Sequence, residues 1–214
     1  MLRLAVGDRI VLFTGAGGEF AATLARADKR EAVARIDAFD PVARESELAV
    51  TLVQGIAAND AMDHAVRRAV ELGAAAIQPV LTTRSARVPD GERGEKRLAH
   101  WRQIVVAACE QCGRNRVPEL NGVVTFERWL DNRNADAAGL VLSPTADIAL
   151  AATPRPQRAL DMLVGPEGGF TADEVALAQR RGMVAVRLGP RVLRAETAAL
   201  ASLAAVNALW GDFR

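Results

Sequence analysis

The sequence predicts an α/β protein in which helices cover a parallel β-sheet and a small β-rich domain comes first. Three observations lead to this prediction. After residue 45, apolar runs of strand length alternate with helical patterns, as in successive βαβ units. Before residue 45, short runs alternate partly between apolar and polar residues, which is typical of hairpins. Near the carboxyl end, two glycine-bearing segments each follow an apolar run and precede a helical pattern, as loops at the carboxyl edge of a parallel sheet do.

The overall composition is that of a soluble globular protein. Half of the 214 residues are hydrophobic and a quarter are charged, so the chain can bury a sizeable core. The longest apolar stretch, Ala198 to Trp210, contains Ser202 and Asn207 and is shorter than the roughly 18 residues that span a bilayer. The start, MLRLAVGDRI, lacks the apolar core of a secretory signal. We therefore expect a cytoplasmic protein without a membrane segment.

The amino-terminal domain, expected over residues 1–45, is predicted to consist of short strands. Partial alternation places these strands at Arg9–Phe13, Glu19–Ala25 and Val33–Asp37. The glycine cluster at residues 15–18 separates the first two strands. We interpret it as a turn, because a phosphate loop would continue with Gly-Lys-Ser/Thr and a helix, whereas a strand follows here.

The second domain is predicted to begin with a βαβ unit. Leu48–Gln54 has the apolar character of a buried strand. Asn59 or Asp60 is expected to cap a helix that ends at Leu72, where a glycine follows. Ala75–Val80 is the next predicted strand.

The remaining elements of this domain, which is expected over residues 46–214, follow from similar patterns. Apolar runs of strand length, two of them soon followed by proline, predict strands. An apolar face at helical spacing, a Thr-Ala-Asp-Glu capping box and an alanine- and leucine-rich run predict helices. The predicted strands are Gly139–Leu142, Ala159–Val164 and Met183–Leu188, and the predicted helices are Glu95–Cys112, Thr171–Arg181 and Ala195–Trp210.

Two loops, Val164–Phe170 and Leu188–Arg194, contain the residues most indicative of ligand binding. Their glycine and proline residues let the backbone bend sharply and approach a ligand without obstruction by side chains. Main-chain NH and CO groups in such loops can bind the edge of an adenine, while leucine and valine side chains sandwich its ring. Neither loop has the lysine or the GxGxxG pattern of a phosphate-binding loop. The alternative is that both are only tight β–α turns.

Two stretches, LVGPEGGFTADE and LGPRVLRAETAAL, resemble the paired signature of the RsmE family of SPOUT-class methyltransferases. AVELGAAAIQPVLTTRS and HWRQIVVAACEQCGRNRVPEL are similar to the family's central region, so the resemblance covers nearly the entire chain. It implies S-adenosylmethionine-dependent methylation of N3 of uracil 1498 in 16S ribosomal RNA, within the small ribosomal subunit. It also implies a deep trefoil knot in the α/β domain, a homodimer and a PUA-like RNA-binding domain at the amino end.

The resemblance also implies a set of residues that hold the cofactor. We hypothesise in addition that Arg194 stabilises the uracil anion that forms as N3 loses its proton, and that Glu167 accepts this proton directly or through water. The alternatives are that Glu167 only ties down the glycine loop and that Arg194 only forms an ion pair, with Glu196 or another acid. The implied S-adenosylmethionine pocket comprises Leu142, Leu163, Gly165, Pro166, Glu167, Gly168, Leu188, Gly189, Val192, Leu193, Arg194, Thr197 and Ala198.

A basic segment at residues 64–116 is the expected RNA-binding region. It holds ten Arg or Lys residues against five Asp or Glu, a local net charge of +5, whereas the entire chain carries +1. Such side chains contact phosphates, which contributes affinity rather than choice of base. The alternative is a solvated helical surface. The residues expected to contact RNA are Arg67, Arg68, Arg84, Arg97, Arg102, Arg114 and Arg116.

Cys109 and Cys112 have the CxxC spacing of a metal or redox site. No second cysteine pair exists, and His64 and His100 are the only histidines. We therefore expect both cysteines to pack within the helix, and no metal site.

Two features depart from the family pattern. The chain begins where the family's sequence is usually already under way, so we expect a shortened amino-terminal domain that lacks at least one strand. The stretch at residues 58–61 has no lysine, whereas relatives usually have one there.

Two alternative functions stay open: a SPOUT enzyme that methylates a ribose 2′-hydroxyl, and an inactive RNA-binding protein. The GPEGGF and LRAETA pairing favours the uracil-N3 methyltransferase.

Overall fold

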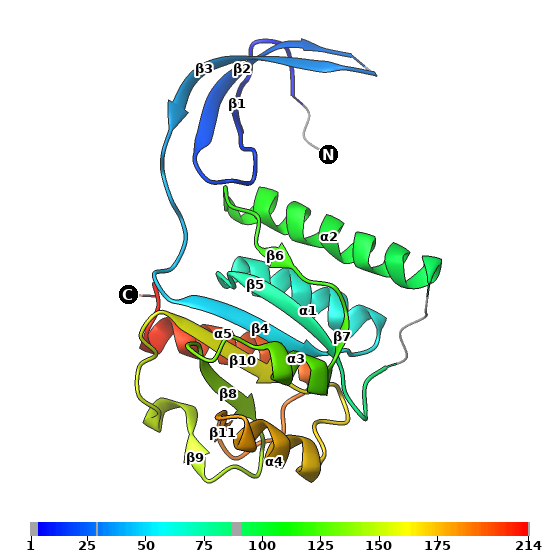
Figure 1. Cartoon of the computed structure of the whole chain (residues 1–214). Helices are drawn as coiled ribbons and strands as arrows, with labels where there is room; N and C mark the ends of the chain where they lie inside the picture. Colours follow the sequence, from blue (N-terminus) through cyan, green and yellow to red (C-terminus); the bar gives the residue numbers. More distant parts are fainter. Residues whose placement is uncertain (1–3, 29, 87–90, 214) are drawn as a thin grey trace. The chain divides into compact units, whose positions relative to one another are not determined.

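The computed structural model describes residues 4–28, 30–86 and 91–213 (Figure 1). The chain divides into two compact units, Met1–Glu45 with Cys109–Val117, and Ser46–Ala108 with Pro118–Arg214. The sequence did not predict that a segment from the middle of the chain belongs to the first unit. Arg87 and Asp90, two charges of the basic segment, lie outside the described residues.

The described part of the first unit contains an antiparallel sheet in the order β1-β2-β3. These elements confirm the three predicted strands, although the first is one residue shorter and the second and third are longer than predicted. The turn between the first two strands requires glycine, because Gly15, Gly17 and Gly18 all have positive φ. The strands are β1 (Arg9–Leu12), β2 (Glu19–Ala27) and β3 (Ala32–Asp40).

The segment Cys109–Val117 packs into the first unit through main-chain and charged contacts. Gly17 N donates a hydrogen bond to Asn115 O at 3.1 Å. Arg114 is buried, and its guanidinium forms an ion pair with Glu45. These contacts explain why the nine residues Cys109–Val117, which form the end of α2 (Glu92–Cys112) and the loop after it, belong to the same unit as the amino-terminal strands.

The described part of the second unit contains a parallel sheet in the order β6-β5-β4-β10-β8-β11-β9, with β7 also paired to β5. Its strands β8, β10 and β11 are neighbours, so their carboxyl ends lie side by side. The strands are β4 (Ala49–Gly55), β5 (Ala76–Leu81), β6 (Glu119–Leu120), β7 (Val124–Thr125), β8 (Ala138–Leu142), β9 (Ile148–Ala149), β10 (Ala159–Val164) and β11 (Val184–Arg187).

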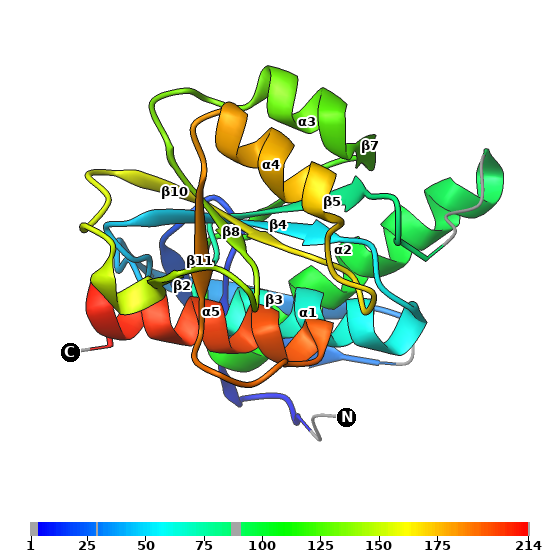
Figure 2. The same cartoon turned by 90° about the horizontal axis from the view of Figure 1, so that it is seen from below.

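Helices cover both faces of this sheet, as the predicted α/β class requires. Figure 2 shows α1 and α5 on one face and α3 and α4 on the other. The predicted capping box is present at the start of α4, where Thr171 N donates to Glu174 Oε2 at 2.8 Å and Glu174 N donates to Thr171 Oγ1 at 3.1 Å. The helices are α1 (Asn59–Glu71), α2 (Glu92–Cys112), α3 (Phe126–Asn132), α4 (Ala172–Arg180) and α5 (Ala195–Leu209), and a short 3₁₀ turn, Leu150–Ala152, follows β9.

The prediction for the start of α1 is wrong. Ala58, rather than Asn59 or Asp60, is the N-cap residue, and no side chain caps the helix locally. The Ala58 amide donates instead to Glu167 Oε1 at 2.7 Å. A carboxylate distant in the sequence therefore satisfies the entry to this helix, so a local Asn or Asp cap is not needed.

The short helix α3 was not predicted, although the sequence contains a signal for it. Thr125 caps the helix by accepting a hydrogen bond from Arg128 N at 3.3 Å. Phe126, Trp129 and Leu130 are buried, and their spacing of three and four residues is that of one helical face. Capping and spacing together would have revealed this helix.

A buried ion pair links α3's carboxyl side to the sheet. Arg133 Nε lies 3.2 Å from Asp161 Oδ2, and the two side chains are 7% and 11% exposed. Gly139 on β8 leaves room for the guanidinium, because a Cβ there would lie 2.9 Å from Arg133 Nη2. Burial raises the pKa of Asp161, although the charge of Arg133 opposes this effect.

Candidate functional site

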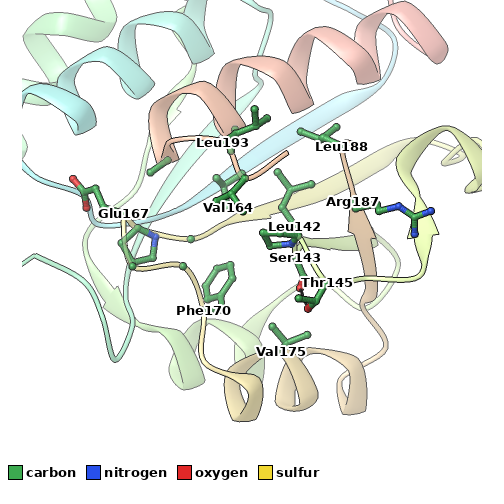
Figure 3. A pocket seen from close by; sticks show the side chains of 18 of the residues that line it. Leu142, Ser143, Thr145, Val164, Glu167, Phe170, Val175, Arg187, Leu188 and Leu193 are labelled. Atoms are coloured by element: carbon green, nitrogen blue, oxygen red, sulfur yellow. Dashed lines mark hydrogen bonds between the residues drawn. The ribbon is translucent and has the colours of Figure 1, made fainter. Parts of the chain in front are cut away.

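A cavity of about 310 Å³ lies at the carboxyl edge of the sheet, where β8, β10 and β11 end side by side (Figure 3). Because these strands are parallel neighbours, loops that are distant in sequence meet at this edge. The lining residues are Arg84, Leu142, Ser143, Pro144, Thr145, Val164, Gly165, Pro166, Glu167, Gly168, Gly169, Phe170, Val175, Val186, Arg187, Leu188, Gly189, Arg191, Val192, Leu193, Ala195 and Ala198.

Apolar side chains face one another across this cavity. Phe170 and Val175 lie on one side, and the opposite side is formed by Leu142, Val164, Leu188 and Leu193 (Figure 3). The ring centroid of Phe170 lies 5.7 Å from that of Phe126, which belongs to the buried core. Facing apolar walls of this kind suit a flat ring, with main-chain groups of the loops at its edge.

The glycine loop at residues 165–170 packs closely against the end of β4. A Cβ on Gly55 would lie 2.6 Å from Pro166 Cδ and 2.8 Å from Pro166 N. Gln54 is buried beside it, and its Nε2 donates to the main-chain oxygens of Gly55 at 2.8 Å and Gly165 at 3.2 Å. The position of the loop therefore depends on β4 as well as on its own sequence.

Two charged side chains hold the same loop from other elements. Glu167 Oε1 accepts the hydrogen bond from Ala58 N, so the carboxylate ties the loop to the start of α1. Arg84, expected from the sequence to contact RNA, lines the cavity, and its Nη1 donates to Gly168 O at 2.8 Å. Both contacts join residues more than eighty positions apart.

Most of the residues expected to hold a cofactor line this one cavity. Leu163 does not, because its side chain belongs to the buried core cluster. Arg194 is the exposed N-cap of α5, and Thr197 lines a separate depression with His64 and Glu196. The ten expected residues that line the cavity are Leu142, Gly165, Pro166, Glu167, Gly168, Leu188, Gly189, Val192, Leu193 and Ala198.

The sequence did not single out the loop after β8. Ser143 and Thr145 line the cavity, and their hydroxyl oxygens lie 3.1 Å apart. Arg187, at the end of β11, also lines it, and its guanidinium donates to Ala146 O at 2.7 Å. The proline at position 144 marked a loop here, but only the order of the strands shows that this loop adjoins the other two.

The other arginines expected to contact RNA have different environments. Arg68 is paired with a glutamate one turn later, and the guanidinium carbon of Arg97 lies 5.2 Å from the ring centroid of Trp101. Arg114 is 5% exposed and forms the ion pair with Glu45. The exposed members, for which the described residues supply no ion-pair partner, are Arg67, Arg102 and Arg116.

The two cysteines are free thiols in the structure. Cys109 is buried, and burial raises the pKa of its thiol to about 11. Cys112 is partly exposed. Within the described residues, no three His, Cys, Asp or Glu side chains gather in a group that could hold a metal ion.

Family models match both parts of the chain. A model described as an RNA methyltransferase domain matches residues 44–207, and one described as an RNA methyltransferase PUA domain matches residues 2–37. The first match contains every residue that lines the cavity. The fold and the site thus define an RNA methyltransferase with an amino-terminal PUA-like domain.

Individual relatives narrow this class. The chain is 36% identical over 219 residues to ribosomal RNA small subunit methyltransferase E from Mycobacterium bovis, covering 97% of this chain and 80% of that one. The chain belongs to the ribosomal RNA small subunit methyltransferase E family, as its signature stretches led us to expect.

Solved structures share the same fold over nearly the full length. The family member from Neisseria gonorrhoeae, bound to S-adenosyl methionine, has a TM-score of 0.94 and 40% identity, covering 99% of this chain and 87% of that one. A methyltransferase from Legionella pneumophila, in complex with bound S-adenosyl methionine, has a TM-score of 0.93 and 35% identity with the same coverage.

Within the part of the chain that the structure describes, no helix combines the length and the apolar character that a membrane span needs.

Proposed function

We propose that this protein transfers a methyl group from S-adenosylmethionine to N3 of uracil 1498 in 16S ribosomal RNA of the small subunit. The observation that carries the proposal is the cavity between the two glycine-bearing loops, lined by ten of the expected cofactor residues. Support comes from relatives that are named small subunit methyltransferases, one of them bound to S-adenosyl methionine at 40% identity.

The residues of the cavity fit this cofactor. Its volume of about 310 Å³ lies at the lower end of the range for small-molecule pockets, roughly 300 to 1,000 Å³. Leu142, Leu188 and Leu193 would contact one face of the adenine and Phe170 the other. A Cβ on Gly165 would lie 3.1 Å from the Gly169 backbone, so this position leaves little room for a side chain. The loop therefore exposes main chain rather than side chains. When bound, S-adenosylmethionine supplies a methyl group on a sulfonium, which is open to in-line displacement.

The protein has to orient the target base, exclude water and remove the N3 proton. Arg194 caps α5 with its backbone, its side chain is exposed, and none of the described acids forms an ion pair with it. A free cation of this kind would stabilise a uracil anion. Glu167 lines the cavity and uses Oε1 for the tie to Ala58, which leaves its second oxygen to accept a proton directly or through water.

The remaining parts of the proposal concern partners and location. The first unit, matched by the PUA model, would bind RNA, and the exposed Arg67, Arg102 and Arg116 would contact phosphates. We also infer a homodimer, a trefoil knot through the cofactor loops, and action in the cytoplasm on the small ribosomal subunit. A measured mass of the native protein tests the dimer.

The proposal is tested by incubating the protein with labelled S-adenosylmethionine and small ribosomal subunits and then mapping the modified nucleotide. Label at N3 of uracil 1498 supports the proposal. Label on a ribose 2′-oxygen would identify a different SPOUT activity, and RNA binding without label would indicate an inactive RNA-binding protein.

The role of Glu167 is tested with Glu167→Gln and Glu167→Ala. Glutamine keeps an oxygen that can accept from Ala58 N but is a poor proton acceptor, whereas alanine loses both functions. If Glu167 accepts the proton, both variants lower kcat by about a hundredfold or more. If the tie alone matters, only the alanine variant loses activity.

A further inference from the structure

Arg84 occupies a position that its expected contact with phosphate does not explain. Its side chain lies along the glycine loop, because a Cβ on Gly168 would lie 3.1 Å from both Cβ and Cδ of Arg84. Its Nη1 donates to Gly168 O at 2.8 Å, and the residue lines the cavity. Gly169 N donates to Pro166 O at 2.8 Å, so the Gly168 carbonyl belongs to a closed turn. The guanidinium thus holds a turn that forms part of the cavity wall.

The backbone that carries Arg84 is itself held in place. Thr83 N donates to Glu174 Oε1 at 2.7 Å, while the other oxygen of Glu174 accepts from Thr171 N at 2.8 Å. Glu174 is only 5% exposed, so its carboxylate joins two segments where water does not compete. Thr82 N also donates to Ser85 Oγ at 3.0 Å, which closes the short loop around Arg84.

These contacts connect the segment after β5 to the middle of the glycine loop and to the residue that follows it. Arg84 contacts the loop at residue 168, and Glu174 contacts Thr171, where α4 begins. A loop rich in glycine loses much backbone freedom when it adopts one conformation, so side chains that fix it in advance reduce the cost of binding a ligand. The capping box pattern of the sequence predicts only the contact within α4.

We propose that Arg84 is a positioning residue that holds the glycine loop in its cofactor-binding conformation, with Glu174 as the anchor of its backbone. This inference rests on the proposed function, because it concerns the affinity of the same cavity for S-adenosylmethionine. It assigns to Arg84 a role in cofactor binding that does not require RNA.

The test uses the full chain and S-adenosylmethionine alone, with affinity measured by calorimetry. Arg84→Met keeps the aliphatic stem that packs on Gly168 and removes the donor to its carbonyl. It should weaken S-adenosylmethionine binding about threefold to tenfold, the effect of one charge-assisted hydrogen bond near the surface. Arg84→Lys keeps a donor and should restore most of this loss. Glu174→Gln, which can no longer accept from both amides, should weaken binding in the same direction.

Arg102→Met is the matched control, because it removes an exposed arginine on α2 that does not line the cavity. It should leave the Kd for S-adenosylmethionine unchanged. In methylation assays, Arg84→Met should raise the KM for S-adenosylmethionine more than the KM for small ribosomal subunits. An unchanged Kd for S-adenosylmethionine in Arg84→Met overturns the inference, and a raised KM for subunits beside it would make Arg84 a phosphate contact. If the wild type itself does not bind S-adenosylmethionine, the proposed function fails, whatever the variants do.

Discussion

The close contact between Gly55 and Pro166 makes a sharp prediction about the substitution Gly55→Ala. The new Cβ would lie 2.6 Å from Pro166 Cδ and 2.8 Å from Pro166 N, and neither atom belongs to a flexible side chain. Carbon atoms that are not bonded prefer a separation of about 3.5 Å or more, so one partner has to move by about 1 Å. Gly55 does not have positive φ, so the effect of the substitution is steric rather than conformational.

The expected magnitude follows from this displacement. Overpacking a closely packed site costs about 1 to 3 kcal/mol. If β4 stays in place and the glycine loop moves, this cost appears as cofactor binding weakened by about fivefold to 150-fold. If the loop stays in place, the same cost appears as a lower free energy of unfolding.

Both quantities have to be measured, by calorimetric titration with S-adenosylmethionine and by urea denaturation. Gly122→Ala is the control, because its Cβ meets no atom within 4 Å and its φ is not positive either. If Gly55→Ala matches Gly122→Ala in affinity and in stability, the steric reasoning is refuted.

Further predictions concern stability and thiol reactivity. Arg133→Met leaves Asp161 buried without its partner and should lower the free energy of unfolding by about 3 kcal/mol at pH 7. The pKa of Asp161 is raised in the folded protein, so its contribution to stability is present below the pKa of the unfolded chain and is lost as the pH rises through the folded pKa. The loss of unfolding free energy caused by Arg133→Met should therefore shrink on acidification in denaturation experiments. Thr171→Ala should lower stability by about 1 kcal/mol, because it removes the hydroxyl that accepts from Glu174 N. With its pKa raised to about 11, Cys109 should resist a thiol reagent at pH 8 and react once the protein is unfolded.

Each of these predictions has an outcome that contradicts it. A penalty for Arg133→Met that does not change with pH would show that Asp161 keeps its charge throughout. Unchanged melting of Thr171→Ala would mean that the capping box adds nothing to stability. Rapid modification of Cys109 in the native state would contradict its burial.

Several elements of this protein could be predicted because the interactions that define them are local. The strand Ala159–Val164 has the bounds that its apolar run predicts, and Thr171 begins α4 because its hydroxyl and the Glu174 carboxylate lie one turn apart. The glycine loops after β10 and β11 were also recognisable, because glycine and proline restrict the backbone directly. For such features, the neighbours along the chain are the neighbours in space.

The tertiary structure decided which of these local features meet. Glu167 satisfies the entry to α1 from a distance of 109 residues, so the expected local cap is not used. Arg114 belongs to a basic segment of the sequence, yet it is buried and paired with Glu45. Arg84, from the same segment, packs against the glycine loop and donates a hydrogen bond to it. Composition and spacing show which residues are charged, but not which groups surround each charge in the folded protein. The order of the strands in the sheet brings distant side chains together, and that order depends on packing over the entire domain.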